Sequence, residues 1–276
     1  MTRVWLPSSL EELWPLWAEN PGAALYAGGT DLLVRRRAGL VRPEALICLE
    51  RVAELGRIEP DGPEVFLGAG ASFSRLLSSP LVTEKYPVLA AALQRIGSPQ
   101  VRHMGTLGGN LVTASPAGDS LPPLYTLDAV VELVAVGATR RVPIAEFIQG
   151  PGQVDLRPGE LVSGVRLPAT DGNLQHFEKV GSRAALAISI ASLAVAGRLS
   201  DQGEVLQIKL AWGSVGPTVV CAPAAEAALQ GKKLTPETLA AAGELAQQAA
   251  SPIDDLRASR EYRLALVKNL LLRLAP

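Results

Sequence analysis

The chain has 276 residues, of which 48% are hydrophobic, and this is enough for one large domain or two modest domains with a substantial core. Its formal net charge of −1 excludes the basic footprint of a nucleic-acid-binding protein. The two cysteines and two histidines do not have the spacing of a metal-ligand motif, so any metal chemistry would have to lie on another chain.

The sequence also predicts where the protein resides. Its first residues lack the charged and then apolar pattern of a signal peptide. The longest apolar candidate, residues 184–196, is shorter than the roughly 20 residues that span a bilayer, and it contains serines. We therefore expect a cytoplasmic protein without membrane insertion.

The first fifty residues predict a small lobe. Short apolar runs at 23–27 and 45–49 are typical of buried strands, and a helix is expected over 30–38 between them, with Thr30 as its N-cap. The basic run Arg35–Arg37 within this helix predicts a solvated face. A role in binding phosphate or a partner is the alternative for this run.

A second lobe is expected next in the chain. It contains predicted strands at 64–69, 129–136 and 161–167 and a predicted helix at 87–96. Between that helix and the second of these strands, residues 113–123 have a Pro-, Gly- and Ser-rich composition that predicts an irregular and functional loop.

A cluster of Pro, Asp, Gly and Asn at 168–174 predicts a linker. The remaining residues predict a smaller α+β domain, with a three-stranded sheet and three helices. The expected strands lie at 177–180, 186–198 and 205–212, and the expected helices at 223–231, 236–250 and 259–274.

The most informative stretch runs from Ile96 to Leu111. Its glycines at 105, 108 and 109 lack a Cβ, so a bulky anion can approach the main chain there. Thr106 and Asn110 add a hydroxyl and an amide. A turn in which several amide N–H groups converge is an anion site, and phosphate is the usual occupant. A tight turn without a ligand is the alternative for an isolated glycine cluster.

A second glycine pair occurs in Ala27-Gly28-Gly29-Thr30-Asp31, before a predicted helix whose first amides favour a phosphate. Two such loops indicate a diphosphate that is held from two sides. We expect the donors to be the amides of Gly28, Gly29, Thr30, Gly108 and Gly109.

The combination of these loops resembles the FAD-binding medium subunit of the molybdenum hydroxylases, the family of xanthine dehydrogenase and carbon monoxide dehydrogenase. The resemblance covers nearly the whole chain. It rests on residues 27–33, residues 106–110, the Ser115-Pro116…Asp119 continuation, residues 177–183 and residues 257–263.

The resemblance implies an α+β fold. It implies a two-lobed FAD-binding domain of the vanillyl-alcohol-oxidase/PCMH type at 1–168, with lobes at about 1–55 and 56–168. A C-terminal α+β domain of the molybdenum hydroxylase flavoprotein type then follows at 169–276.

The resemblance also implies a set of FAD-binding residues. Residues 27–32 and 106–110 would line the diphosphate and the ribityl arm, Asp119 would hold a polar part of the adenosine or ribose, and Lys179 would lie close to the flavin. A cation near N1–C2=O would raise the flavin potential. The full set is Leu25, Tyr26, Ala27, Gly28, Gly29, Thr30, Asp31, Leu32, Ile96, Thr106, Gly108, Gly109, Asn110, Asp119, Val162 and Lys179.

Some of these residues have ordinary alternatives. Ile96 and Val162 would form apolar walls for the ring system, or would simply belong to the core. Lys179 could instead be a surface lysine, and Asp119 a turn acid. No catalytic residue and no metal ligand is expected in this chain.

The function implied by the resemblance is an electron relay in an oxidoreductase. A molybdopterin large subunit would oxidise the substrate, and a small subunit with [2Fe-2S] clusters would pass the electrons to this FAD. NAD+ or another acceptor would then receive them. The partners would form a heterotrimer or its dimer.

Three alternatives remain at this stage. The first is a stand-alone FAD-dependent oxidoreductase of the same fold, although no acid–base pair for a substrate is evident. The second is a doubly wound nicotinamide-binding protein, although neither loop completes Gly-x-Gly-x-x-Gly. The third is a non-catalytic scaffold that has lost FAD, although the glycines of both loops are intact.

Overall fold

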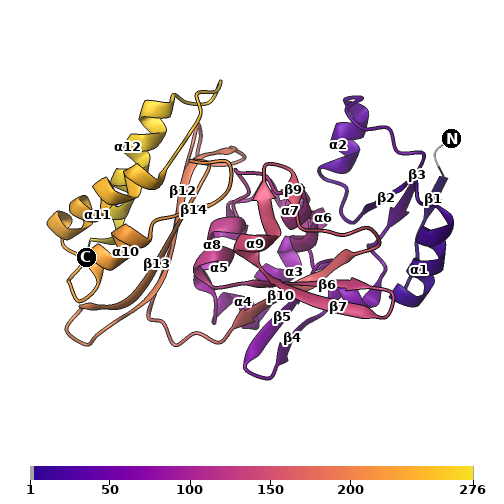
Figure 1. The fold of residues 1–276 in the computed structure, drawn as a ribbon, viewed down its shortest axis with the longest axis horizontal. Helices are drawn as coiled ribbons and strands as arrows, with labels where there is room; N and C mark the ends of the chain where they lie inside the picture. The colour runs from indigo at the N-terminus through magenta and orange to yellow at the C-terminus, as the bar shows by residue number, and fades with distance from the viewer. Residues whose placement is uncertain (1–2, 276) are drawn as a thin grey trace.

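The computed structural model describes residues 3–275. An N-terminal lobe, a central lobe and a C-terminal domain follow one another along the long axis of the molecule (Figure 1). Within the described residues, no helix is both long and apolar enough to cross a membrane.

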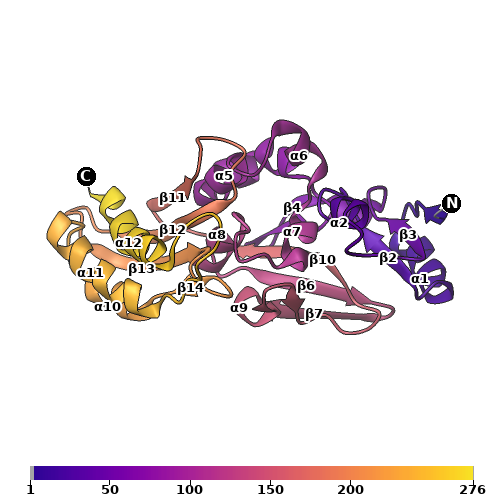
Figure 2. The same cartoon turned by 90° about the horizontal axis from the view of Figure 1, so that it is seen from above.

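The N-terminal lobe is built on a three-stranded parallel sheet in the order β1-β3-β2. Leu13 and Ile47 are fully buried in its core. Helix α2 has no buried residue; it stands above the sheet in Figure 1, and the view from above shows it on the side that faces the central lobe (Figure 2). The elements are β1 (Arg3–Trp5), α1 (Leu10–Glu19), β2 (Ala23–Tyr26), α2 (Leu32–Arg37) and β3 (Ala45–Cys48).

The start of α2 differs from the prediction. Its N-cap is Asp31 and not Thr30, and the Asp31 side chain makes no capping hydrogen bond. The backbone turn at Gly29, which has a φ of 69°, delays the helix beyond the threonine.

The central lobe contains a five-stranded antiparallel sheet in the order β4-β5-β10-β6-β7. Its strands are β4 (Ile58–Asp61), β5 (Glu64–Gly68), β6 (Val130–Ala135), β7 (Ala138–Pro143) and β10 (Leu161–Pro168), and a small hairpin is formed by β8 (Ile148–Gly150) and β9 (Gln153–Val154). The helical segments are η1 (Ala53–Gly56), α3 (Phe73–Leu77), α4 (Pro80–Thr83), α5 (Pro87–Gln94), α6 (Pro99–Met104), α7 (Leu107–Thr113), α8 (Leu121–Thr126) and α9 (Ile144–Phe147).

The glycine-rich stretch of this lobe is more regular than predicted. Ser98 caps α6 by accepting from the Val101 amide, and Thr106 caps α7 by accepting from the Gly109 amide. The segment at 113–123, expected to be irregular throughout, becomes helical at Leu121. Serine or threonine before a helical turn satisfies amides that otherwise have no partner, and this stabilises such short helices.

The C-terminal domain packs a sheet against three helices. The sheet has four strands in the order β11-β12-β13-β14, and not the three expected, because the two-residue strand β14 pairs with the end of β13. The elements are β11 (Leu174–Gly181), β12 (Ser189–Leu199), β13 (Val205–Gly213), β14 (Val220–Cys221), α10 (Pro223–Leu229), α11 (Pro236–Ala249), α12 (Arg260–Leu270) and η2 (Leu271–Leu274).

Strand β12 explains how the two domains join. Leu193 and Val195 face the helices of the C-terminal domain, whereas Ala194 and Ala196 belong to the core of the central lobe. Alternate residues of a strand point to opposite faces of its sheet. Both faces of this strand are therefore buried, one in each domain.

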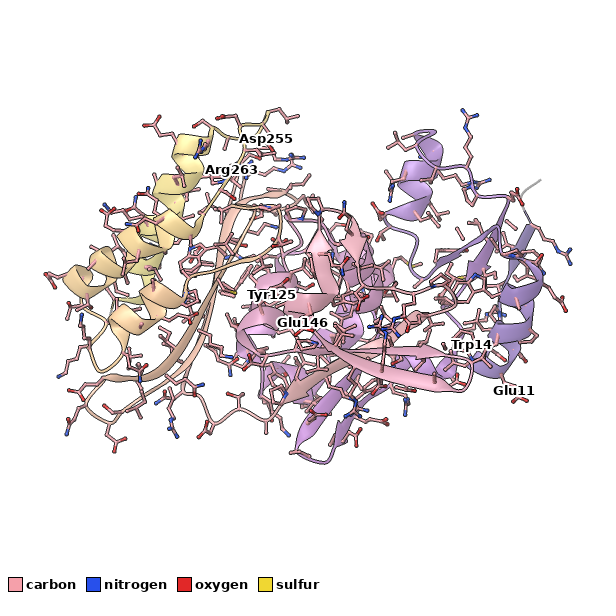
Figure 3. All side chains as sticks on the ribbon, viewed as in Figure 1. Glu11, Trp14, Tyr125, Glu146, Asp255 and Arg263 are labelled. Atoms are coloured by element: carbon pink, nitrogen blue, oxygen red, sulfur yellow. The ribbon has the colours of Figure 1, made fainter. Side chains whose placement is uncertain are left out.

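A buried arginine secures one end of the C-terminal domain. Arg263 of α12 donates to the carbonyls of Ile190, at 2.6 Å, and Ser214, at 2.9 Å. Its other amino group donates to Asp255, which lies beside it (Figure 3). The hydrogen bonds from the Arg257 amide, from the Arg263 guanidinium and from the Ala258 amide hold the pKa of Asp255 well below its usual range. These bonds fix the loop before α12 against the ends of β12 and β13.

Candidate cofactor site

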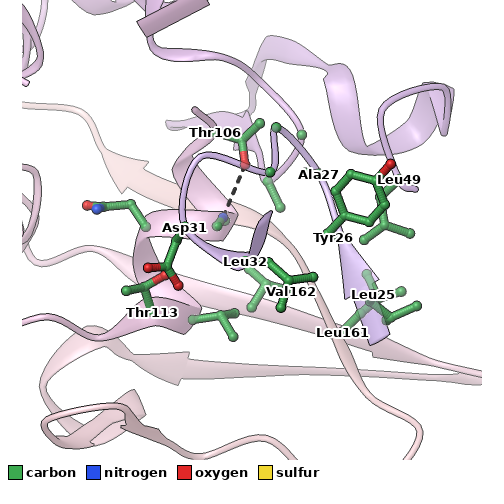
Figure 4. Close-up of a pocket in the computed structure, with 18 of the residues that line it drawn as sticks. Leu25, Tyr26, Ala27, Asp31, Leu32, Leu49, Thr106, Thr113, Leu161 and Val162 are labelled. Atoms are coloured by element: carbon green, nitrogen blue, oxygen red, sulfur yellow. Dashed lines mark hydrogen bonds between the residues drawn. The ribbon is translucent and has the colours of Figure 1, made fainter. Parts of the chain in front are cut away.

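A cavity of about 780 Å³ lies between the N-terminal and central lobes (Figure 4). Three segments form most of its wall: the turn from β2 into α2, the start of α7, and the chain that leads into β10. All of the residues expected to bind FAD line this cavity except Ile96, Asp119 and Lys179.

The turn after β2 offers a run of free donors. Within residues 3–275, the amide N–H groups of Gly28, Gly29, Thr30, Asp31 and Leu32 have no acceptor in the chain. A Cβ built on Gly28 would lie 1.6 Å from the carbonyl oxygen of Met104, so only glycine allows the two segments to approach this closely. The turn is thus held against the end of α6 while its amides stay unpaired.

The two amide donors expected from the second loop already have hydrogen-bond acceptors within the protein. The Gly108 amide donates to the Ala69 carbonyl at 2.8 Å, and the Gly109 amide donates to the Thr106 hydroxyl at 3.1 Å (Figure 4). These two amides are therefore not free in this structure, and their contact with a diphosphate stays a prediction. Gly109 still lies at the cavity wall, where its missing side chain leaves space for a ligand.

The remaining wall is mainly apolar. Leu25, Leu161 and Val162 lie together on the side of the cavity formed by β2 and β10 (Figure 4). Tyr26 lies nearby, and burial, aided by Cys48 beside it, raises the pKa of its phenol to about 12. This wall suits a flat aromatic group.

The three remaining residues form a second cluster at the junction of the two domains. Lys179 of β11 donates to the Arg95 carbonyl, next to Ile96, at 3.1 Å, and to Asp119 Oδ2 at 2.5 Å. The side chains of Lys179 and Asp119 are only 7% and 8% exposed, so Lys179 is not the surface lysine of the alternative.

Asp119 keeps one oxygen without a partner. Its Oδ1 atom is buried and accepts no hydrogen bond from the described residues. Burial raises the pKa of this carboxyl to about 6, although the charge of Lys179 acts in the opposite direction. A buried acceptor without a donor is costly, so this oxygen is suited to a ligand that brings an N–H or O–H group.

One hydrogen bond links the cavity to the second cluster. Ser120, which follows Asp119, donates its hydroxyl to Asn110 Oδ1 at 2.6 Å, and Asn110 lines the cavity. Because Asp119 and Lys179 touch, they belong to the same end of any extended ligand. The structure thus brings together two residues that the resemblance assigned to different parts of FAD.

The structure also adds residues to the wall that the prediction missed. Leu161 precedes Val162, and Thr113 lies one helical turn after Gly109 and Asn110, so both would have followed from a correct helix and strand assignment. Trp17 and Leu49 reach the cavity through the packing of the N-terminal lobe, for which the sequence gives no signal. Arg35 is a further addition to the predicted set, although a role in binding phosphate was the alternative for its basic run.

Within residues 3–275, no group of three or more histidine, cysteine, aspartate or glutamate side chains is arranged to hold a metal ion. The cavity wall contains neither histidine nor cysteine among these residues.

Two family models match the chain. The FAD binding domain in molybdopterin dehydrogenase matches residues 1–170, and the carbon monoxide dehydrogenase flavoprotein C-terminal domain matches residues 176–275. The xanthine dehydrogenase FAD-binding subunit of Escherichia coli O157:H7 is 33% identical over 264 residues, which cover 92% of this chain and 88% of that one.

Solved structures agree with these matches. A carbon monoxide dehydrogenase from Hydrogenophaga pseudoflava matches with a TM-score of 0.92 and 33% identity, over 99% of this chain and 95% of that one. Quinoline 2-oxidoreductase from Pseudomonas putida 86 matches with a TM-score of 0.94 and 28% identity, over the same shares of the two chains. The chain therefore belongs to the family of FAD-binding medium subunits of the xanthine and carbon monoxide dehydrogenases, and it is a flavoprotein subunit of an oxidoreductase.

Proposed function

We propose that this chain is the electron-transfer subunit of a complete molybdenum hydroxylase. In this proposal a small subunit with [2Fe-2S] clusters delivers the electrons, a molybdopterin large subunit oxidises the substrate, and NAD+ or another acceptor takes the electrons away. FAD supplies the redox chemistry of this chain, since a flavin can take up electrons singly and release them as a pair. The other two subunits would complete a heterotrimer or its dimer.

The observation that carries the proposal is the run of five amides, unpaired within the described residues, in the wall of a large and mainly apolar cavity. A buried diphosphate has two negative charges that must be matched by donors. The amides of residues 28–32 provide such donors without any side chain. We therefore place the diphosphate at this turn, and not between two loops.

With the diphosphate at this turn, the positions of the two ends of the cofactor follow. The apolar wall at Leu25, Leu161 and Val162 suits the adenine ring. Beyond Asn110 and Ser120, the pair of Asp119 and Lys179 suits the polar edge of the isoalloxazine, because one residue offers an unpaired acceptor and the other a cationic donor. The PCMH-type description and the division of the FAD-binding domain into two lobes are part of this proposal.

Two glycines of the same backbone conformation test the placement. Gly29 and Gly39 have φ values of 69° and 73°, so valine imposes similar backbone strain at both. Gly29 lines the cavity, and a Cβ there would lie 2.7 Å from the end of the flexible Leu33 side chain, which can move aside; a Cβ at Gly39 would meet nothing within 4 Å. We expect Gly29→Val to abolish FAD binding, measured by titration of the apoprotein, and Gly39→Val to retain it. Equal FAD affinity in both folded variants would contradict the placement.

A further inference from the structure

One cationic side chain of the described residues lines the cavity. Among the described residues that line it, Arg35 of α2 is the only lysine or arginine, while Asp31 and Glu160 are acidic. Glu160 is already paired, since both of its carboxylate oxygens accept from Arg140. Arg35 and Asp31 are therefore the two charges of the wall that a ligand can influence.

The contact between these two residues is weak. Arg35 Nη1 lies 3.7 Å from Asp31 Oδ2, and the side chains are 51% and 48% exposed. Exposed pairs of this kind, four residues apart on a helix, contribute little to stability. If Arg35 left Asp31 and paired with another anion, the fold would therefore be disturbed only slightly.

A diphosphate at residues 28–32 would meet neutral amide donors but no compensating charge from them. A guanidinium supplies that charge, and its planar fork can bond to two phosphate oxygens at once. We propose that Arg35 is the counter-charge of the cofactor's diphosphate and that it leaves Asp31 when the cofactor binds. This inference rests on the proposed position of FAD in the cavity.

The neighbouring arginine provides a matched control. Arg37 belongs to the same basic run and the same exposed helix, but it does not line the cavity. If the positive charge of α2 acted only as a general field, neutralising either arginine would have the same effect. If Arg35 binds the diphosphate directly, only its own substitution matters.

The test is a titration of the full-length apoprotein with FAD and with riboflavin, which has no phosphate, at low and high salt. Arg35→Gln should weaken FAD binding about tenfold, the loss expected for one charge-assisted contact, and should reduce its salt dependence. Arg35→Lys should retain most of the affinity, and Arg37→Gln should match the wild type. Riboflavin binding should be the same in all of these proteins.

A second variant separates binding from a structural role. Asp31→Asn removes the competing carboxylate, and it should leave α2 intact because the Asp31 side chain makes no capping bond. We expect this variant to bind FAD more tightly than the wild type, whereas a purely structural pair predicts equal or weaker binding.

Two outcomes would overturn the inference. One is Arg35→Gln with the FAD affinity and salt dependence of the wild type, and the other is an equal loss of FAD and riboflavin affinity. A wild-type apoprotein that binds no FAD would refute the proposed function as well, so the two failures can be told apart.

Discussion

At the scale of single residues, the buried pair of Lys179 and Asp119 is the feature that most directly concerns the redox chemistry. Both side chains are less than one-tenth exposed, and the pair bridges the two domains. A cation held next to the pyrimidine side of a flavin stabilises its reduced, anionic form. The geometry of this pair therefore leads to a prediction about the potential of the bound FAD.

Lys179→Met should lower the midpoint potential of the bound FAD, by on the order of tens of millivolts, where 30 mV corresponds to about 1.4 kcal/mol for two electrons. The measurement is a spectroelectrochemical titration of the FAD-loaded chain. Lys209→Met is the control, because Lys209 pairs with Asp128 and does not line the cavity. The same potential in both variants would show that Lys179 is not near the flavin ring.

Single residues also show which structural roles could be predicted from the sequence and which could not. The glycines at 28 and 29 were correctly expected at a turn that precedes a helix. Gly108 was expected to free the main chain for a ligand, but it lies in α7, where a Cβ would come within 2.5 Å of the Ala69 side chain. Glycine in a helix lowers stability by about 1 kcal/mol relative to alanine. The close packing of α7 against Ala69, at the end of β5, offsets this loss. Such tertiary packing leaves no local signal.

At the scale of elements, an ionic clamp holds the segment that closes one side of the cavity. Arg140 of β7 donates to both oxygens of Glu160, at 2.7 and 2.8 Å, and to the side chain and carbonyl of Asp155, at 2.7 Å each. These bonds from Arg140 lower the pKa of Glu160 to about 2. The clamp fixes the segment between β9 and β10, and Leu156 and Glu160 of this segment line the cavity.

The clamp predicts how stability depends on pH. Because the pKa of Glu160 is depressed in the folded state, its contribution is complete above the ordinary pKa of 4.5 and is lost as the pH falls toward 2. Glu160→Gln should therefore reduce the free energy of unfolding by about 1 kcal/mol at pH 7. The difference from the wild type should shrink between pH 4.5 and pH 2.

Denaturant unfolding at several pH values measures this difference. Glu146→Gln serves as the control, because Glu146 is exposed on α9 (Figure 3) and has no ion pair among the described residues. It should leave the free energy of unfolding unchanged at every pH. A difference between Glu160→Gln and the wild type that stays constant down to pH 2 would show that the clamp does not act through the charge of Glu160.

Strands with a clear apolar run were predictable, whereas helices within the glycine- and proline-rich sequence and the shortest strand were not. The strands β2, β3, β5, β6, β10 and β13 lie close to the ranges predicted from their apolar runs. Helices α6 and α7 were missed because their glycines and prolines indicate a turn, although Ser98 and Thr106 are good caps. Strand β14 has two residues and pairs only because β13 offers a free edge, so no pattern in the sequence could reveal it.

At the scale of the whole molecule, the proposed cofactor path runs from the N-terminal lobe to the junction with the C-terminal domain. The cavity lies at one end of this path, the pair of Asp119 and Lys179 lies at the other, and Asn110 and Ser120 connect them. This arrangement would place the flavin ring where both domains contact it. The grouping of these residues was predictable only from the resemblance, because their separation in sequence is large.

The central claim is that this chain relays electrons and depends on partner subunits for the oxidation of a substrate. Stepwise reconstitution tests this most directly: the FAD-loaded chain is assayed alone, then with the iron–sulfur subunit, and then with the molybdopterin subunit as well. Substrate hydroxylation and flavin absorbance are followed at each step. We expect no hydroxylation by the chain alone, and reduction of its flavin by substrate only when both partners are present. Hydroxylation by the lone chain, or a flavin that stays oxidised in the complete complex, would contradict the account.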